Sequence, residues 1–336
     1  MKNVQMDNKE WIQIVSRFNK PDVGKSIWQI INSFVPYLLL WPLMYYSLQV
    51  SYLLTLALAI LTAGFQVRMF IIFHDCGHGS FFRSKRANKI VGTIMGSLTF
   101  TPYDYWHKEH HLHHNTVGNL DKRGHGDVMT LTVKEYQAMS TGKKLYYRIY
   151  RNPVTIFLIA PFILFVLWFR IPKKSMTPSE KWSVYTSNLI IAAFSIGMIL
   201  LMGWKAFLII QIPVIYFATM AGVWLFYVQH QFEDVIWTRQ EKWDYKQMAL
   251  EGSSFLKFPR VLQWFSGNIG FHHIHHLSPK IPNYNLEKCH NSSPLFETIK
   301  PVTFTSSMRT INLRLWDEDA AKLISFRHFR KFLVSG

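Results

Sequence analysis

Residues 52–78 read YLLTLALAILTAGFQVRMFIIFHDCGH, an apolar run that ends in two histidines. A helix needs roughly 20 mostly apolar residues to cross the hydrocarbon core of a bilayer, and residues 52–73 meet that length. Arg68 lies near the end of this run, where its aliphatic stem can follow apolar surface while its charge reaches the headgroups. The sequence therefore predicts a transmembrane helix at 52–73 that carries a histidine pair just outside the membrane.

Three further apolar runs are long enough to cross, and the four predicted spans pair into two hairpins. They cover about residues 30–48, 52–73, 183–202 and 206–228. The connections at 49–51 and 203–205 hold one Lys between them, whereas the flanking polar segments carry nearly all the Lys and Arg. Because cytoplasmic loops are enriched in Lys and Arg, both hairpin tips are expected outside and both chain ends in the cytoplasm.

Two shorter apolar stretches, about 89–102 and 154–169, contain Pro102 and Pro161 and are predicted to be interfacial or re-entrant. The four basic residues of 170–181 then stay on the cytoplasmic side. We expect an all-α integral membrane protein with a single domain over 1–336. Its four spans and interfacial helices would carry a cytoplasmic helical cap formed by about 74–182 and 229–336.

The composition agrees with a multi-pass protein of the cytoplasmic membrane. The chain has 37 Lys and Arg against 20 Asp and Glu, a formal net charge of +17. Most of this charge lies between apolar segments, which favours contact with anionic lipid headgroups and argues against nucleic acid as a partner. The polar first 25 residues predict no signal peptide. Cys76 and Cys289 give no disulfide framework, as expected in a reducing compartment.

Eleven of the fifteen histidines fall in three short clusters next to apolar segments. In the first cluster, His74 and His78 share one helical face if the helix continues. The second cluster, 107–114, fits the pattern H-x-x-H-H in two registers, and the third, 271–276, fits it in one. The two registers are His107, His110, His111 and His110, His113, His114, and the third cluster gives His272, His275 and His276.

The number of histidines predicts two metal ions. Neutral imidazole suits zinc, copper and iron, so the ligand type alone does not select the metal. A zinc site uses three or four protein ligands, and eight ordered histidines are too many for one ion. A carboxylate-bridged di-iron bundle would need two Glu-x-x-His pairs, but only Glu287 and His290 offer one, and the zinc-protease pattern H-E-x-x-H does not occur in the sequence.

In these clusters the sequence resembles the histidine-box membrane fatty acid desaturases, through HDCGH, EHHLHH and FHHIHH in that order. The likeness extends through NLDKRGHGD, VWLFYVQHQFED and GNIGFHHIHHLSPKIPNYNLE, and it is nearest to the acyl-lipid, delta-5 type enzymes of Gram-positive bacteria. The family's second box starts four residues after a tryptophan, here Trp106, which implies the register that begins at His110. The family also carries a histidine after its last span, and His230 has that place.

The resemblance implies nine metal ligands: His74, His78, His110, His113, His114, His230, His272, His275 and His276. It also implies two iron ions, molecular oxygen as co-substrate, and electrons from a ferredoxin- or flavodoxin-like protein, since no H-P-G-G heme motif is fused. The expected function is an oxygen-dependent desaturase that places a cis double bond in acyl chains of membrane phospholipids. The three-residue gap in HDCGH favours a lipid-linked acyl chain over acyl-CoA.

Alternative functions share the metal clusters. A di-iron lipid or alkane hydroxylase would use the same ligands, and a histidine-rich metal transporter is a candidate from another class, although its ligands should lie within the spans. Ligating imidazoles usually donate their second N–H to a carboxylate or carbonyl, and Asp75, Asp127 and Asp234 are candidate partners. The basic residues Arg309, Arg314, Lys322 and Arg327 are expected to face the inner leaflet or an acidic electron carrier.

Overall fold

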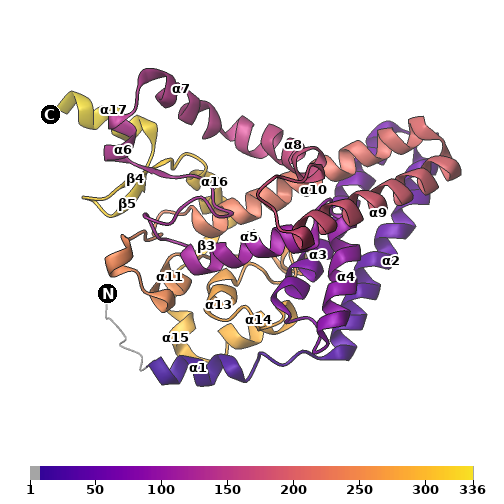
Figure 1. Ribbon diagram of the computed structural model, residues 1–336, viewed down its shortest axis with the longest axis horizontal. Helices are drawn as coiled ribbons and strands as arrows, with labels where there is room; N and C mark the ends of the chain where they lie inside the picture. The colour runs from indigo at the N-terminus through magenta and orange to yellow at the C-terminus, as the bar shows by residue number, and fades with distance from the viewer. Residues whose placement is uncertain (1–7, 336) are drawn as a thin grey trace.

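The protein is described by a computed structural model that covers residues 8–335, so residues 1–7 and 336 of the predicted domain lie outside the described part (Figure 1). Helices dominate it. The longer helices are α1 (Asn8–Ser16), α2 (Val23–Ser47), α3 (Tyr52–His78), α4 (Lys85–Leu98), α5 (Tyr103–Thr116), α7 (Thr141–Tyr150), α9 (Pro178–Met202), α10 (Trp204–His230), α14 (Asn283–His290) and α17 (Phe326–Ser335). The shorter ones are α6 (Val133–Ala138), α8 (Ala160–Val166), α11 (Tyr245–Glu251), α12 (Arg260–Phe265), α13 (His272–Leu277), α15 (Pro294–Glu297) and α16 (Phe304–Thr310).

Four of these helices, α2, α3, α9 and α10, are long and apolar enough to cross a membrane, which confirms the predicted number of long spans. Two of them begin earlier than predicted because polar residues form their first turns. The Asp22 side chain accepts a hydrogen bond from the Lys25 backbone N–H at 3.1 Å and starts α2. Thr177 and Glu180 form a capping box that starts α9 at Pro178.

Helix α3 lies at the centre of the bundle and packs against α2, α4, α5 and α10. The close approach of α4 depends on Gly96, because a Cβ there would lie 2.6 Å from the Phe73 ring. Helix α3 ends six residues after Phe73, at Gly79, whose φ of +63° favours glycine. The chain therefore turns immediately after His78, and the last turn of α3 is fixed against α4 and α5.

The two shorter apolar stretches form helices that lie beside the spans. Helix α4 has 14 residues, about 21 Å, which is less than the hydrocarbon thickness of a bilayer. Residues Val154–Arg170 comprise a π-helical turn (Val154–Ile159), α8 and a 3-10 turn (Trp168–Arg170), and they meet α7 at a bend of 53°. By length and composition this bent pair fits either a broken span or a re-entrant loop, so its interfacial placement stays a prediction.

The cap departs from the all-α prediction by five short strands. They are β1 (Leu131–Thr132), β2 (Phe255–Lys257), β3 (Pro301–Thr303), β4 (Leu315–Asp317) and β5 (Lys322–Ile324). β4 pairs in parallel with β1 and antiparallel with β5, and β2 pairs in parallel with β3. Two or three residues are too few to show the alternating pattern by which strands are predicted. The strands tie the C-terminal segment to the connection between α5 and α6 and to the connection between α11 and α12.

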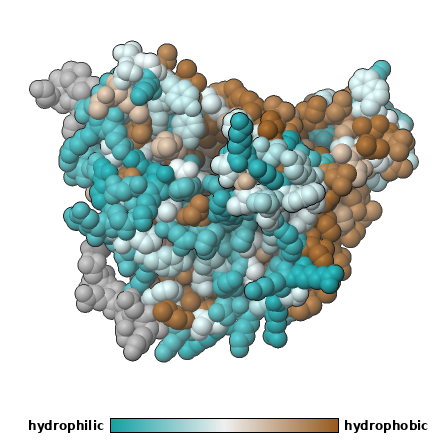
Figure 2. Space-filling view, viewed as in Figure 1, coloured by the Kyte–Doolittle hydropathy of each residue, from teal (hydrophilic) through white to brown (hydrophobic). Residues whose placement is uncertain are grey.

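The surface of the protein has an apolar part over the long helices and a polar part over the cap. Figure 1 shows the far ends of α2, α3, α9 and α10 projecting to one side of the cap, with α17 on the opposite side. Figure 2 shows apolar residues gathered over these projecting helices and polar residues over the cap. Large apolar side chains such as Leu200, 82% exposed, cover the helices. Contact with lipid is the environment in which such a surface is stable, so this is a membrane protein.

Candidate metal centre

The first two histidines lie on one face of the last turns of α3. His74 and His78 are buried, and their ring centroids are 4.7 Å apart, as the i, i+4 spacing predicts. Gly77 lies between them, and a Cβ there would lie 3.1 Å from the His107 ring. The close packing of α5 against this turn brings the second histidine cluster to the first.

Helix α5 presents His110, His113 and His114 to the interior and turns its other two histidines away. The His107 ring stacks on Tyr103 with centroids 6.1 Å apart, and His111 is exposed. The register inferred from the family resemblance is therefore the one in which all three imidazoles join the buried clusters. The pattern H-x-x-H-H alone could not distinguish the two registers, because both place three histidines on one helical face.

The third cluster forms α13, which is held by β2. The Leu256 backbone N–H donates to the Gly270 carbonyl at 2.7 Å, and the Phe255 and Phe271 rings stack 5.0 Å apart. This contact sets the start of α13, from which His272, His275 and His276 point inward. His230 ends α10 and lies between the second and third histidine clusters. Its Nε2 atom is 2.9 Å from that of His272.

All nine predicted histidines meet in two adjacent groups, and within each group one nitrogen from every residue lies within 4.8 Å of the others. The first group comprises His74, His78, His110, His114 and His275, and the second comprises His113, His230, His272 and His276. The groups touch where the His114 and His276 rings stack with centroids 4.1 Å apart. Residues from sequence positions 74 to 276 thus converge at one end of α3, α5 and α10.

The donor atoms fit metal ions. Burial and the neighbouring imidazoles hold the pKa of five of these histidines well below its usual value, so their rings are neutral at pH 7. The five are His110, His114, His272, His275 and His276. Neutral imidazole is the form that ligates metals. Both ring nitrogens of His276 and the Nε2 atom of His78 are buried without a hydrogen-bond partner in the described part of the chain. A bound cation would satisfy such buried acceptors.

Two carboxylates orient the histidines from behind. The Nδ1 atom of His74 lies 3.1 Å from Asp75 Oδ1, and that of His113 lies 2.6 Å from Asp127 Oδ1. Asp75 and Asp127 are therefore hydrogen-bond partners of histidines, as the sequence predicts. The third predicted partner, Asp234, is wrong, because it is exposed and pairs with Lys300 at 2.6 Å. Proximity along the chain failed there since α10 ends at His230 and the following turn leads to the surface.

His230 uses a backbone oxygen in place of the predicted carboxylate. Its Nδ1 atom lies 3.2 Å from the Gly252 carbonyl. Sequence reasoning also missed Asn283, whose backbone N–H and side-chain amide both donate to Asp75 Oδ2, at 2.7 and 2.8 Å. The sequence holds no local signal for this contact, because 208 positions separate the two residues. Asn283 in turn exchanges hydrogen bonds with the buried Gln29 of α2.

Two further histidines are buried close by but stay outside both groups. The His273 Nε2 atom lies 3.1 Å from His290 Nδ1, and the His290 ring packs against Phe255 and Phe271. The Glu287 and His290 pair therefore takes no part in the two groups, as its sequence pattern suggested.

A cavity of about 510 Å³ reaches both histidine groups, since His74, His110 and His272 line it. Most of its wall is apolar, from α3, α8 and α10, and includes Phe70, Leu164 and Phe226. This size lies within the range of ligand pockets that enclose a small molecule. The predicted interfacial stretch around Pro161 therefore forms one wall of a cavity beside the histidines.

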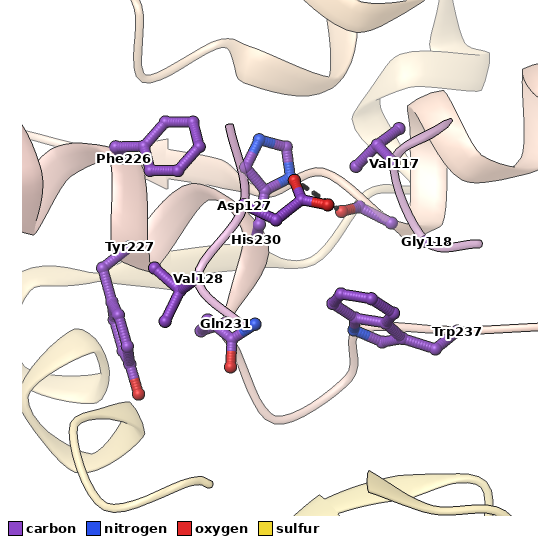
Figure 3. Close-up of a pocket in the computed structure, with 10 residues that line it drawn as sticks. Val117, Gly118, Asp127, Val128, Phe226, Tyr227, His230, Gln231 and Trp237 are labelled. Atoms are coloured by element: carbon purple, nitrogen blue, oxygen red, sulfur yellow. Dashed lines mark hydrogen bonds between the residues drawn. The ribbon is translucent and has the colours of Figure 1, made fainter. Parts of the chain in front are cut away.

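A second cavity is smaller, about 10 Å³, and lies beside His230 and Asp127 (Figure 3). Asp127 Oδ2 and Trp237 Nε1 are buried polar atoms without a hydrogen-bond partner among the described residues, and both residues line this cavity. Such a volume is about that of one water-sized probe. Of the two cavities, only the larger has room for a chain of carbon atoms.

Comparison with known proteins gives consistent matches. Residues 50–305, which contain all nine histidines, match the profile of the fatty acid desaturase family. The chain is 47% identical over 327 residues to a protein of Bacillus subtilis (strain 168) named fatty acid desaturase, covering 97% of this chain and 93% of that protein. It is 30% identical over 274 residues to an "sn-1 acyl-lipid omega-3 desaturase (ferredoxin)" of Nostoc, covering 74% and 69%. A Synechocystis protein of the same name is 29% identical over 251 residues, covering 70% and 64%.

Proposed function

The chain belongs to the fatty acid desaturase family, and we propose that it places a cis double bond in acyl chains of membrane phospholipids with two iron ions held by its nine converging histidines. It is an oxidoreductase of the membrane. Two adjacent groups of buried imidazoles, reached by one large and mainly apolar cavity, are the observation that carries the proposal.

The reaction removes two hydrogens from neighbouring methylene carbons. Molecular oxygen, two electrons and two protons are consumed, and the products are the alkene and two water molecules. Side-chain acids and bases cannot break an unactivated C–H bond, and the irons, when bound, would supply the redox chemistry that can. His74, His78, His110, His114 and His275 would hold one ion, and His113, His230, His272 and His276 the other.

The protein's own residues position and enclose the substrate. The apolar wall of the large cavity would exclude water from the acyl chain and keep two of its carbons beside His74, His110 and His272. Asp75 and Asp127 would fix the orientation of His74 and His113 by accepting their Nδ1 hydrogens, which leaves each Nε2 atom free to ligate.

The orientation and the electron source are part of the same proposal. The positive-inside rule supports cytoplasmic termini, outward hairpin tips and a cytoplasmic metal centre in the inner membrane. The Nostoc and Synechocystis relatives carry ferredoxin in their names, which supports a ferredoxin- or flavodoxin-like donor. The predicted basic residues Arg309, Arg314 and Lys322 lie on the C-terminal part of the cap, where an acidic carrier could dock.

Expression in a host that lacks unsaturated lipids tests the function. Mass spectrometry of the lipids should locate a new double bond, whereas a hydroxyl group would support the hydroxylase alternative. Alanine at His74, His113, His230 or His276 should abolish the product while the protein stays in the membrane. His111→Ala is the matched control, since this exposed histidine of α5 lies outside both groups. Unchanged product in the His230→Ala variant would remove that residue from the proposed ligands.

A further inference from the structure

Lys173 lies at the mouth of the large cavity, just after the 3-10 turn that follows α8. It is exposed, and it is the one Lys or Arg among the described residues that line this cavity. Its Nζ atom donates a hydrogen bond to the Tyr105 hydroxyl at 2.7 Å. The ammonium group also lies 5.2 Å from the Tyr105 ring centroid and 5.7 Å from that of Trp168. Two aromatic side chains therefore hold the cation at the rim.

Unlike the charges of Lys89 and Lys108, the charge of Lys173 is not neutralised by a carboxylate in the described part of the chain. Lys89 forms an ion pair with Asp104, and Lys108 forms one with Glu180 at 2.8 Å. Among the described residues, the hydrogen-bond partner of the Lys173 ammonium group is the Tyr105 hydroxyl. An ammonium group has three donors, so this cation retains capacity for an anionic ligand.

The polarity of the cavity wall sets the direction in which an anionic amphiphile can bind. Lys173 is exposed at the rim, where an anion keeps its contact with water. The wall beyond it is mainly apolar and favours an alkyl chain. A molecule with one anionic end and one long apolar chain is therefore stabilised with its anion at Lys173 and its chain beside the histidines.

Helix α8 separates the cavity from the outside by a single helix thickness. Leu164 and Phe165 line the cavity, whereas Ile159, Ile163 and Leu167 on the opposite side are exposed. Trp168, 56% exposed, lies at the rim itself. Tryptophan with a neighbouring lysine is typical of the membrane–water interface, where the ring lies at headgroup level and the ammonium reaches the phosphates. The rim is thus placed for a ligand that arrives from the bilayer.

We infer that Lys173 binds the phosphate of the phospholipid substrate at the cavity mouth, while the acyl chain of the same lipid enters the cavity beside α8. This inference rests on the proposed function for the identity of the substrate. It makes Lys173 a residue that determines specificity for a phosphate-bearing lipid. The same phosphate chemistry could come from inorganic phosphate, which the experiment has to separate from the lipid.

Binding measured by native mass spectrometry of the detergent-purified full chain tests this inference without any turnover. The probes are phosphatidylglycerol and diacylglycerol with the same saturated chains. We expect Lys173→Gln to weaken phosphatidylglycerol binding about tenfold, the value of one charge-assisted hydrogen bond, and to leave diacylglycerol binding unchanged. Lys173→Arg should retain most of the affinity. Lys174→Gln is the matched control, since Lys174 is the exposed neighbour that does not line the cavity.

Equal losses in the Lys173→Gln and Lys174→Gln variants would overturn the inference, because they would reveal only the general attraction of a basic protein for anionic lipid. Equal affinity of the unmodified protein for both probes would also overturn it. Millimolar inorganic phosphate should leave phosphatidylglycerol bound, and displacement of the lipid would refute a lipid phosphate as the ligand. Since no double bond is formed in this assay, its failure is distinguishable from failure of the proposed desaturase function.

Discussion

Replacing Asp75 with asparagine should remove one metal ion of the two. Asp75 Oδ2 accepts two hydrogen bonds from Asn283, at 2.7 and 2.8 Å, so an asparagine here has to present its oxygen to Asn283. Its NH₂ group then faces the Nδ1 atom of His74, which has to become an acceptor. The proton of a neutral His74 moves to Nε2, where it blocks the nitrogen that should bind the metal.

The expected loss follows from this change of tautomer. Removing the partner of a ligating histidine typically lowers metal affinity 10- to 100-fold, or about 1.4 to 2.8 kcal/mol. Asp127→Asn should have a smaller effect on the other group. Asp127 Oδ2 has no hydrogen-bond donor in the described part of the chain, so an asparagine there can turn its oxygen toward His113.

The assay is the iron content of purified protein after dialysis against increasing concentrations of a chelator. Asp234→Asn is the matched control, because it makes the same chemical change at an exposed carboxylate that pairs with Lys300. The Asp75→Asn variant should lose one ion at a chelator concentration that leaves both ions in the control. Identical iron retention in the two variants would refute the role assigned to Asp75.

Three other predictions use different parts of the molecule. Gly222→Leu should abolish desaturation without lowering the melting temperature, because Gly222 lines the large cavity and a Cβ there meets no atom within 4 Å. The control variant, Gly197→Leu on α9, is equally unobstructed but away from the cavity and should stay active; equal activity of both variants would contradict the acyl site. Burial raises the pKa of the Cys289 thiol to about 12, so iodoacetamide at pH 8 should label this thiol only after the protein unfolds. Peptide mass spectrometry would detect the label, and rapid labelling of the native protein would contradict this burial. Arg151→Met should lower the melting temperature, because this buried side chain donates to Gln231 Oε1 at 3.0 Å and to the Leu313 carbonyl at 2.8 Å, and methionine forms neither bond. An unchanged melting temperature would show that water replaces these bonds.

The sequence predicts the parts of this structure that depend on local patterns. Apolar length gives the four long helices, but it misses their polar turns. These are the first turns of α2 and α9, which Asp22 and Thr177 cap, and the last residues of α3 and α10, which carry histidines. The spacing of histidines gives most of the candidate metal residues. His230 and the choice between His107 and His110 needed the family resemblance, because a single histidine after a span and two overlapping registers carry no distinguishing signal.

The parts that sequence reasoning missed depend on contacts between distant segments. Asn283 reaches Asp75 only because α14 packs beside the end of α3, and Asp234 leaves the site although it lies four positions after His230. The large cavity needs walls from α3, α5, α8 and α10 together, so no one helix reveals it. Strands of two or three residues, such as β1 and β4, are formed by tertiary pairing and have no pattern of their own.

The central claim, that nine histidines hold two neighbouring metal ions, is tested most directly by anomalous scattering at the iron edge from crystals of the iron-loaded protein. We predict two peaks, one surrounded by the five histidines of the first group and one by the four of the second. A single peak, or a peak between His273 and His290, would contradict the claim.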